Sequence, residues 1–136
     1  MDESMESLGA EGVEAIIVGV DNGGINRTNE YSPFDVPGDG GGQAHLFLEF
    51  LLSDFMPLVE NQFRVSRERE QTFLFGSSLG ALISLYGLFE RPDRFGGAGL
   101  MSPSLWHGDY AIFDYLQTRT PSGGRIYIDV GTRELS

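Results

Sequence analysis

The sequence contains no cysteine and no lysine, and only two of its 136 residues are histidines. Without cysteine, disulfide bonds, thiolate metal sites and thiol redox chemistry are excluded, and the composition fits a reducing compartment. There is also no apolar run of the roughly 18 residues that a membrane span requires. Residues 1–4 carry two acidic side chains where a signal peptide would be basic. We therefore expect a cytoplasmic protein.

Basic residues are scarce as well: nine arginines face 20 acidic residues, which gives a formal net charge of -11. The average field of such a chain repels nucleic acid and anionic membrane surfaces, so neither is expected as a partner. His45 and His107 are far apart in the sequence, and the carboxylates near them are scattered. Because a metal site needs clustered ligands, the sequence predicts no metal.

What is present indicates a packed domain. Hydrophobic residues make up 40% of the chain and aromatic residues 12%, which is enough for a core and rules out a disordered polypeptide. Helix and strand patterns alternate along the chain, which is typical of a mostly parallel sheet. We predict one α/β domain over residues 1–136, a three-layer α/β/α sandwich with helices on both faces of the sheet.

The expected elements follow from hydrophobic periodicity and from glycine and proline positions. The continuous apolar run at 15–20 predicts a strand buried on both faces. Between it and the next element, the glycine-rich segment 25–42 is predicted to be a long loop, which in a compact domain is functional or disordered. Strands are expected at 15–20, 71–75, 97–101 and 125–130, and helices at 2–12, 43–62 (kinked at Pro57), 79–90 and 110–118.

A G-x-S-x-G motif at 76–80 lies between the strand expected at 71–75 and the helix expected at 79–90. A chain with 19 glycines produces these letters by chance more often than most, but strand, motif and helix in this order are the context of a nucleophile elbow. Ser78 is therefore the predicted nucleophile. The backbone N–H of Leu79, at the start of the helix, is a predicted oxyanion donor.

The sequence resembles the Putative esterase family of α/β-hydrolases, which includes enterochelin esterases, feruloyl esterases and S-formylglutathione hydrolase. The stretches that carry the resemblance are 17–24, Arg27 with 29–33, 76–80, 91–96, 102–104 with Trp106, and 127–134. The resemblance implies hydrolysis of a small-molecule carboxylic ester (aryl, catecholate or sugar-linked) through a serine acyl-enzyme, without a cofactor. Acyl transfer to a sugar and a non-catalytic binding or structural domain are the alternatives.

The same resemblance implies that these residues form the central portion of an incomplete α/β-hydrolase fold. The run at 15–20 would be the fourth strand, and the second oxyanion donor would come from a loop before residue 1. The general-base histidine would follow a strand beyond residue 136. We therefore expect the chain by itself to be inactive or nearly so. Its uncovered strand edges would favour self-association and low solubility.

Glu134 follows the last expected strand, where the family carries the acid of its triad, so the resemblance makes it the predicted acid. The alternative is a solvated charge at a frayed chain end. Asp129 competes for the role, but it lies within the strand and ranks second. His107 follows the strand at 97–101 and either supplies a base or, as we favour, lines the pocket wall with Trp106. His45 is expected at a helix end on the surface.

Arg27, Glu30 and Tyr31 lie in the loop after the run at 15–20, which places them at the predicted active-site edge of the sheet. They could orient a substrate, with Arg27 pairing a carboxylate or phenolate. A structural ion pair between Arg27 and Glu30 explains the same residues equally well, and the sequence leaves both interpretations open.

Overall fold

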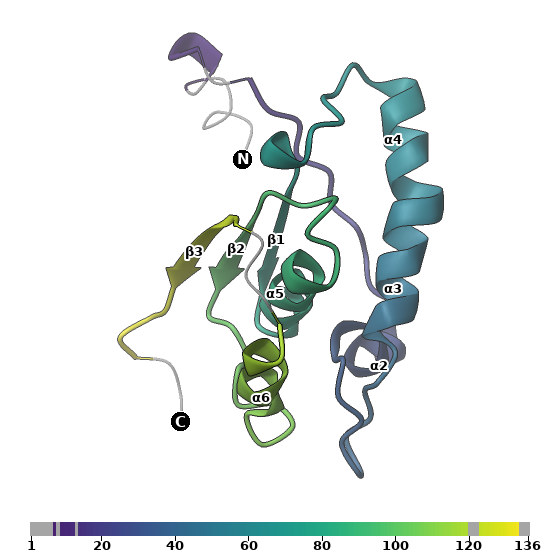
Figure 1. The fold of residues 1–136 in the computed structure, drawn as a ribbon, viewed down its shortest axis with the longest axis vertical. Coiled ribbons are helices and arrows are strands. Elements are labelled where there is room, and N and C mark those ends of the chain that lie inside the picture. The colour runs from purple at the N-terminus through teal and green to yellow at the C-terminus, as the bar shows by residue number, and fades with distance from the viewer. Residues whose placement is uncertain (1–6, 8, 13, 120–122, 134–136) are drawn as a thin grey trace.

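A computed structural model describes residues 7, 9–12, 14–119 and 123–133. Its centre is a parallel sheet of three strands in the order β1 (Phe73–Ser77), β2 (Gly97–Met101) and β3 (Arg125–Asp129), as Figure 1 shows. Helix α5 (Leu79–Glu90) connects β1 to β2, and α6 (Ala111–Gln117) connects β2 to β3. The predicted parallel α/β fold is confirmed, with these strands and helices within two residues of their expected bounds.

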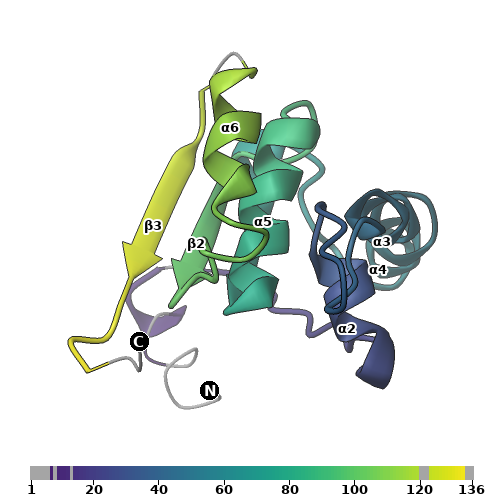
Figure 2. The same ribbon diagram turned by 90° about the horizontal axis from the view of Figure 1, so that it is seen from below.

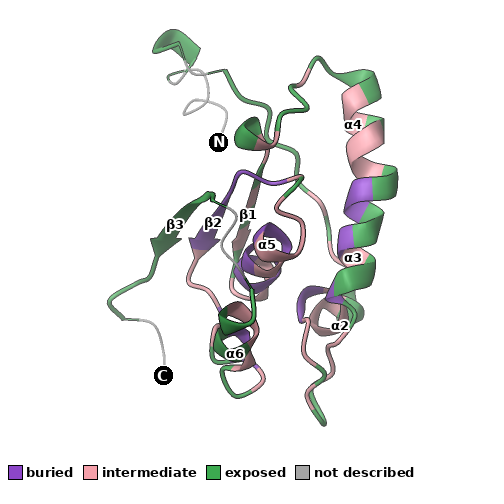
Figure 3. Ribbon diagram, viewed as in Figure 1, coloured by how far each residue is buried: buried purple, intermediate pink, exposed green. Residues whose placement is uncertain are grey.

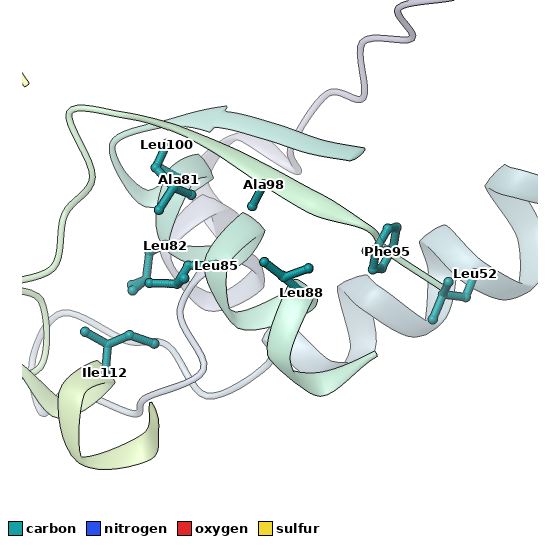
Figure 4. Packing of buried hydrophobic residues seen from close by; sticks show 9 residues of the cluster. All are labelled: Leu52, Ala81, Leu82, Leu85, Leu88, Phe95, Ala98, Leu100 and Ile112. Carbon is teal, nitrogen blue, oxygen red and sulfur yellow. The ribbon is translucent and has the colours of Figure 1, made fainter. Parts of the chain in front are cut away.

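Helix α5 packs against the sheet through side chains that the strand register brings to one face. Leu74 of β1 lies opposite Ala98 of β2, and side chains paired in this way point to the same side of a parallel sheet. Leu82 of α5 and Leu100 of β2 are fully buried between the two layers. Figure 4 shows the cluster, which consists of Leu52, Ala81, Leu82, Leu85, Leu88, Phe95, Ala98, Leu100 and Ile112. This core fixes the start of α5 relative to the strand ends.

A long helical stretch lies beside α5 and consists of α3 (Ala44–Phe50), a π-helical turn η2 (Leu51–Phe55) and α4 (Met56–Gln62). It confirms the helix expected at 43–62. The irregularity expected at Pro57 takes the form of the π turn just before it, since proline has no N–H to donate to the preceding turn and lies in the first turn of α4. The buried side chains of this helical stretch are Ala44, Leu48, Leu51 and Leu52.

The predicted strand at 15–20 is wrong. These residues have no regular secondary structure, and Ile16, Ile17 and Val18 are 51%, 59% and 42% exposed. A strand forms only beside a neighbour that accepts and donates its backbone hydrogen bonds. Within the described residues, β1 pairs with β2 alone, and the run at 15–20 forms no ladder with the unpaired outer edge of β1. The helix expected at 2–12 lies largely outside the described residues.

The predicted loop at 25–42 is also partly wrong, because it contains helical structure. A 3₁₀ turn η1 (Gly24–Asn26) leads directly into the short helix α2 (Arg27–Tyr31). Beyond α2 the chain forms a tight reversal that is closed by a bridge between Val36 and Gly40. A further 3₁₀ turn, η3 (Arg69–Gln71), precedes β1.

Helices α5 and α6 cover one side of the sheet, and α2, α3 and α4 lie beside α5, as the view in Figure 2 shows. On the other side Phe73, Phe75 and Tyr127 are 47%, 68% and 59% exposed. Strand β3 is exposed along its whole length (Figure 3). The described residues therefore form two layers of the expected three-layer sandwich, which is an incomplete α/β fold. Among these residues, no helix combines the length and apolar character needed to cross a membrane.

Candidate active site

The chain turns sharply at Ser78, between the last residue of β1 and the first residue of α5. Ser78 has φ 59° and ψ -123°, a backbone conformation that side-chain-bearing residues rarely adopt. Its N–H donates to the carbonyl of Met101 at 3.0 Å, and its own carbonyl accepts from the N–H groups of Ala81 and Leu82. The strained conformation is thus held by hydrogen bonds to β2 and to α5. Such strain often occurs at functional sites.

The two glycines of the motif differ in the space that a side chain would find. A Cβ added at Gly76 would lie 2.2 Å from the carbonyl oxygen of Gly80, so no larger residue fits there without a shift of the backbone. A Cβ added at Gly80 would meet only the ring of Tyr31, at an ordinary 3.8 Å. A side chain is therefore sterically excluded at Gly76 but not at Gly80.

The backbone N–H of Leu79 is the first of α5 and therefore has no partner within the helix. Among the described residues, no acceptor outside the helix binds the Leu79 N–H either. The positive end of the helix dipole lies at the same place, where it stabilises negative charge. The Leu79 side chain packs against the cluster between α5 and the sheet and against a second buried cluster, which anchors this turn. The second cluster consists of Tyr31, Ala44, Leu48, Leu51 and Ile83. An oxygen that becomes negative beside Ser78 would be stabilised here.

Ser104 contacts the predicted nucleophile directly. Its hydroxyl oxygen lies 3.0 Å from that of Ser78, and its N–H donates to the Ser78 carbonyl at 3.2 Å. Ser104 belongs to the loop after β2 and is 4% exposed. Sequence reasoning included it in the resembling stretch 102–104 but gave it no role. The available signal was that loops after neighbouring parallel strands meet at one edge of the sheet.

His107 lies deeper in the same loop and differs from both expectations for it. Its side chain is 2% exposed, with Nδ1 3.5 Å from a carboxylate oxygen of Asp39. Its Nε2 has no hydrogen-bond partner among the described residues, so His107 does not bind the Ser78 hydroxyl. Being enclosed, it does not line an open wall either. Trp106 is 62% exposed, so its predicted place on the pocket wall stays a prediction.

Arg27 and Glu30 do not form the ion pair that the sequence left open. The Arg27 guanidinium lies over the Tyr31 ring, 5.4 Å from its centroid, while Glu30 accepts a 2.7 Å hydrogen bond from the N–H of Gly23. Tyr31 is buried, which raises the pKa of its hydroxyl. Tyr31 also shares a buried cluster with Ile83, and Leu79 packs against that cluster, so α2 packs against α5. A role of Arg27 towards substrate stays a prediction.

The predicted acid Glu134 lies outside the described residues. Its rival Asp129 is the last residue of β3, opposite Met101 in the register, and its carbonyl accepts a 2.7 Å hydrogen bond from Ser102. This bond ties β3 to the loop that carries Ser104. His45 is exposed in the first turn of α3, as predicted.

An open hollow of about 410 Å³ is not lined by Ser78. It lies beside α3 and is lined by residues that include Asp21, Glu30, Phe47 and Phe50. Among the described residues, no three or more His, Asp or Glu side chains are grouped so that they could hold a metal ion. The hydroxyl pair at Ser78 and Ser104, beside the free start of α5, is therefore the candidate active site.

A parallel sheet whose first strand turns at a strained serine into a helix packed on that sheet is the architecture of an α/β-hydrolase. A family model described as Putative esterase matches residues 1–136. The chain belongs to this esterase family.

Three comparisons show how far the similarity extends. YbbA of Bacillus subtilis, an uncharacterised protein, is 29% identical over 127 residues, which is 89% of this chain and 50% of YbbA. The siderophore triacetylfusarinine C esterase of Aspergillus fumigatus is 39% identical over 74 residues, 54% of this chain and 25% of that enzyme. The solved structure of siderophore hydrolase EstA from Aspergillus nidulans has a TM-score of 0.68 and 28% identity, and the match covers 80% of this chain and 42% of EstA. The chain thus spans half or less of the length of these relatives.

Proposed function

We propose that the protein hydrolyses carboxylic esters with Ser78 as its nucleophile. The observation that carries the proposal is the strained turn at Ser78, with φ 59°, at the start of α5. A serine in this position presents its hydroxyl to a substrate while the helix start faces the same point. Membership of the esterase family supports the reaction class.

In the proposed reaction, the Ser78 hydroxyl oxygen attacks the acyl carbon and its proton passes to a histidine base. The Leu79 N–H stabilises the oxyanion, and the alcohol leaves with the proton that the base returns. Water then attacks the acyl-enzyme by the reverse proton path and releases the acid. Glu134 is the proposed residue that orients the base.

The base itself is the missing part of this scheme. Within the described residues, His107 is enclosed beside Asp39 and His45 is on the surface of α3. Neither is hydrogen-bonded to Ser78. Since an unassisted serine hydroxyl is a weak nucleophile, we propose that these 136 residues alone hydrolyse esters slowly.

For the substrate, we propose a small siderophore-type ester. Two of the relatives are named siderophore triacetylfusarinine C esterase and siderophore hydrolase EstA. These names favour hydrolysis over acyl transfer to a sugar. Arg27 would attract a carboxylate or phenolate of such a molecule, and the exposed ring of Trp106 would stack on an aryl group.

The test uses the protein as its gene encodes it, a fluorophosphonate probe and a chromogenic aryl ester. We expect one probe per chain on Ser78 and no labelling or turnover in Ser78→Ala. Ser77→Ala is the matched control, because Ser77 is the exposed neighbour at the end of β1, and it should keep both. Turnover that survives in Ser78→Ala overturns the nucleophile assignment. A folded protein that is neither labelled nor active supports the non-catalytic alternative.

A second measurement addresses the substrate. Incubation with triacetylfusarinine C or enterobactin should release the free acid fragments, detected by mass spectrometry, and Ser78→Ala should release none. Turnover of simple aryl esters without release from either siderophore would leave the esterase proposal standing and overturn the proposed substrate class.

A further inference from the structure

The hydrogen bond between the hydroxyl groups of Ser78 and Ser104 can be donated from either side. Burial decides the direction. Ser104 is 4% exposed, and within the described part of the chain its hydroxyl has no acceptor except the Ser78 oxygen. A buried donor without an acceptor is costly, whereas the half-buried Ser78 hydroxyl can donate to water or to a base. Ser104 is therefore the donor.

We propose that Ser104 is a positioning residue for the nucleophile, an inference that rests on the proposed function of Ser78. When Ser104 donates to the Ser78 oxygen, it occupies one lone pair of that oxygen. The Ser78 proton must then point away from Ser104, towards the open side of the turn where a base and a substrate would arrive. The rotation of the Ser78 hydroxyl is thus set before substrate binds.

The backbone around Ser104 is suited to this role because it is fixed at several points. Its N–H donates to the Ser78 carbonyl, and its carbonyl accepts from the N–H of His107 at 3.2 Å. On the other side of the turn, Ser102 donates to Asp129 of β3 and Ser78 donates to Met101 of β2. The two hydroxyl groups are therefore carried by segments that are bound to each other and to the sheet.

The chemical effect should be largest while Ser78 attacks. As the base takes the Ser78 proton, negative charge builds on the serine oxygen, and a hydrogen bond to a charged acceptor is stronger than one to a neutral hydroxyl. Once the bond to the acyl carbon has formed, the oxygen belongs to an ester and accepts more weakly. Ser104 keeps its own proton throughout. It should act on the chemical step and hardly on substrate binding.

The experiment compares Ser104→Ala, Ser104→Thr and Ser84→Ala in the protein as its gene encodes it, using the aryl ester. Ser84 is the matched control, because it is also 4% exposed and its hydroxyl donates to a backbone carbonyl, that of Gly80, at 2.8 Å. For Ser104→Ala we expect kcat to fall roughly 10- to 100-fold with KM within about twofold, as for loss of a hydrogen bond to a charged group. Ser104→Thr keeps the hydroxyl and should recover most of kcat. Ser84→Ala should retain the wild-type kcat.

The rate of fluorophosphonate labelling at Ser78 gives a second readout that does not depend on the acyl group. It should fall in Ser104→Ala in parallel with kcat. The inference is overturned by an unchanged kcat in Ser104→Ala, by equal losses in Ser104→Ala and Ser84→Ala, or by a loss that appears in KM alone. If activity depends on Ser78 and Ser104→Ala matches the wild type, only this inference fails. If activity does not depend on Ser78, the proposed nucleophile is wrong, and the role of Ser104 that rests on it is overturned as well.

Discussion

Gly76 lies directly against Gly80 across the turn at Ser78, so that a Cβ on Gly76 would come within 2.2 Å of the Gly80 carbonyl oxygen. The reverse does not hold, because a Cβ on Gly80 would find only Tyr31 at 3.8 Å. The two glycines of the motif therefore form a matched pair, in which one position forbids a side chain and the other accepts it.

From this pair we predict opposite outcomes for two alanine substitutions. Gly76→Ala should lower the free energy of unfolding by about 3 kcal/mol, at the upper end for an overpacked site, and should abolish labelling of Ser78. Gly80→Ala should leave the free energy of unfolding unchanged or raise it by up to about 1 kcal/mol, because alanine is the better helix former. Urea unfolding curves and fluorophosphonate labelling check both. Equal losses in the two variants would contradict the steric argument.

A second prediction concerns stability at alkaline pH. Burial and a 2.6 Å hydrogen bond to Glu90 raise the pKa of Tyr115, which links α6 to α5. In the unfolded chain a tyrosine ionises near pH 10, while folded Tyr115 keeps its proton. Above about pH 10 the unfolded state therefore binds fewer protons, and the free energy of unfolding should fall as the pH rises.

The measurement is urea unfolding at several pH values from 8 to 11 in the wild type and in Tyr115→Phe. The variant should lose part of the alkaline slope and should differ little in slope from the wild type below pH 9. Part of the slope should remain, because burial also raises the pKa of Tyr31 and Tyr86. Identical slopes above pH 10 would show that the Tyr115 hydroxyl does not contribute.

Local patterns were sufficient to predict the elbow. The helix predicted at 79–90 agrees with α5, since its apolar spacing and the Arg91-Pro92 stop are both local signals. The strand at 15–20 could not be judged in this way. An apolar run indicates only that burial would be favourable, while a strand also needs a partner that is distant in sequence. Helix α2 was missed because glycine and proline around it outweighed its own five residues.

For the candidate site, too, the sequence predicted the residues of the local motif but not the contacts made by distant loops. Ser78 and Leu79 follow from one motif, so their positions could be read from the sequence. The contact of Ser104 with Ser78 and the enclosure of His107 beside Asp39 depend on how the loop after β2 folds back. That folding is set by hydrogen bonds to β3 and by packing against residues 34–36, which no local pattern encodes.

A third prediction follows from the uncovered face of the sheet. Phe73 and Phe75 project from β1 over glycines of β2 and are 47% and 68% exposed. Exposed apolar surface beside an unpaired strand edge favours association. We expect the 136-residue chain to sediment as oligomers at micromolar concentration.

The double variant Phe73→Thr, Phe75→Thr should shift this equilibrium towards monomer, because threonine keeps strand propensity and removes apolar area. Phe113→Ser is the control, since Phe113 is 46% exposed on α6, on the helical side of the sheet, and should leave the oligomers unchanged. A monomeric wild-type chain with cooperative unfolding would contradict the prediction.

The last prediction concerns Arg27, whose guanidinium is held over Tyr31 and is not engaged in an ion pair with Glu30. A cation placed in this way is available to an anionic substrate group. Arg27→Gln should raise KM for an aryl ester that carries a carboxylate by roughly fivefold, about 1 kcal/mol, as for a partly screened charge pair. KM for the matched neutral ester should stay the same, and so should kcat for both.

Arg119→Gln is the control for general electrostatics, because this arginine also lies over a tyrosine, Tyr115, but it follows the end of α6 and is paired with Glu90. It removes the same charge and should not distinguish the two esters. The comparison of two substrates separates substrate recognition from damage to the fold, because a weakened structure would raise KM for both esters alike. Equal increases in KM for the charged and the neutral ester in Arg27→Gln would therefore assign Arg27 a structural role, as a support for Tyr31 against the first turn of α5.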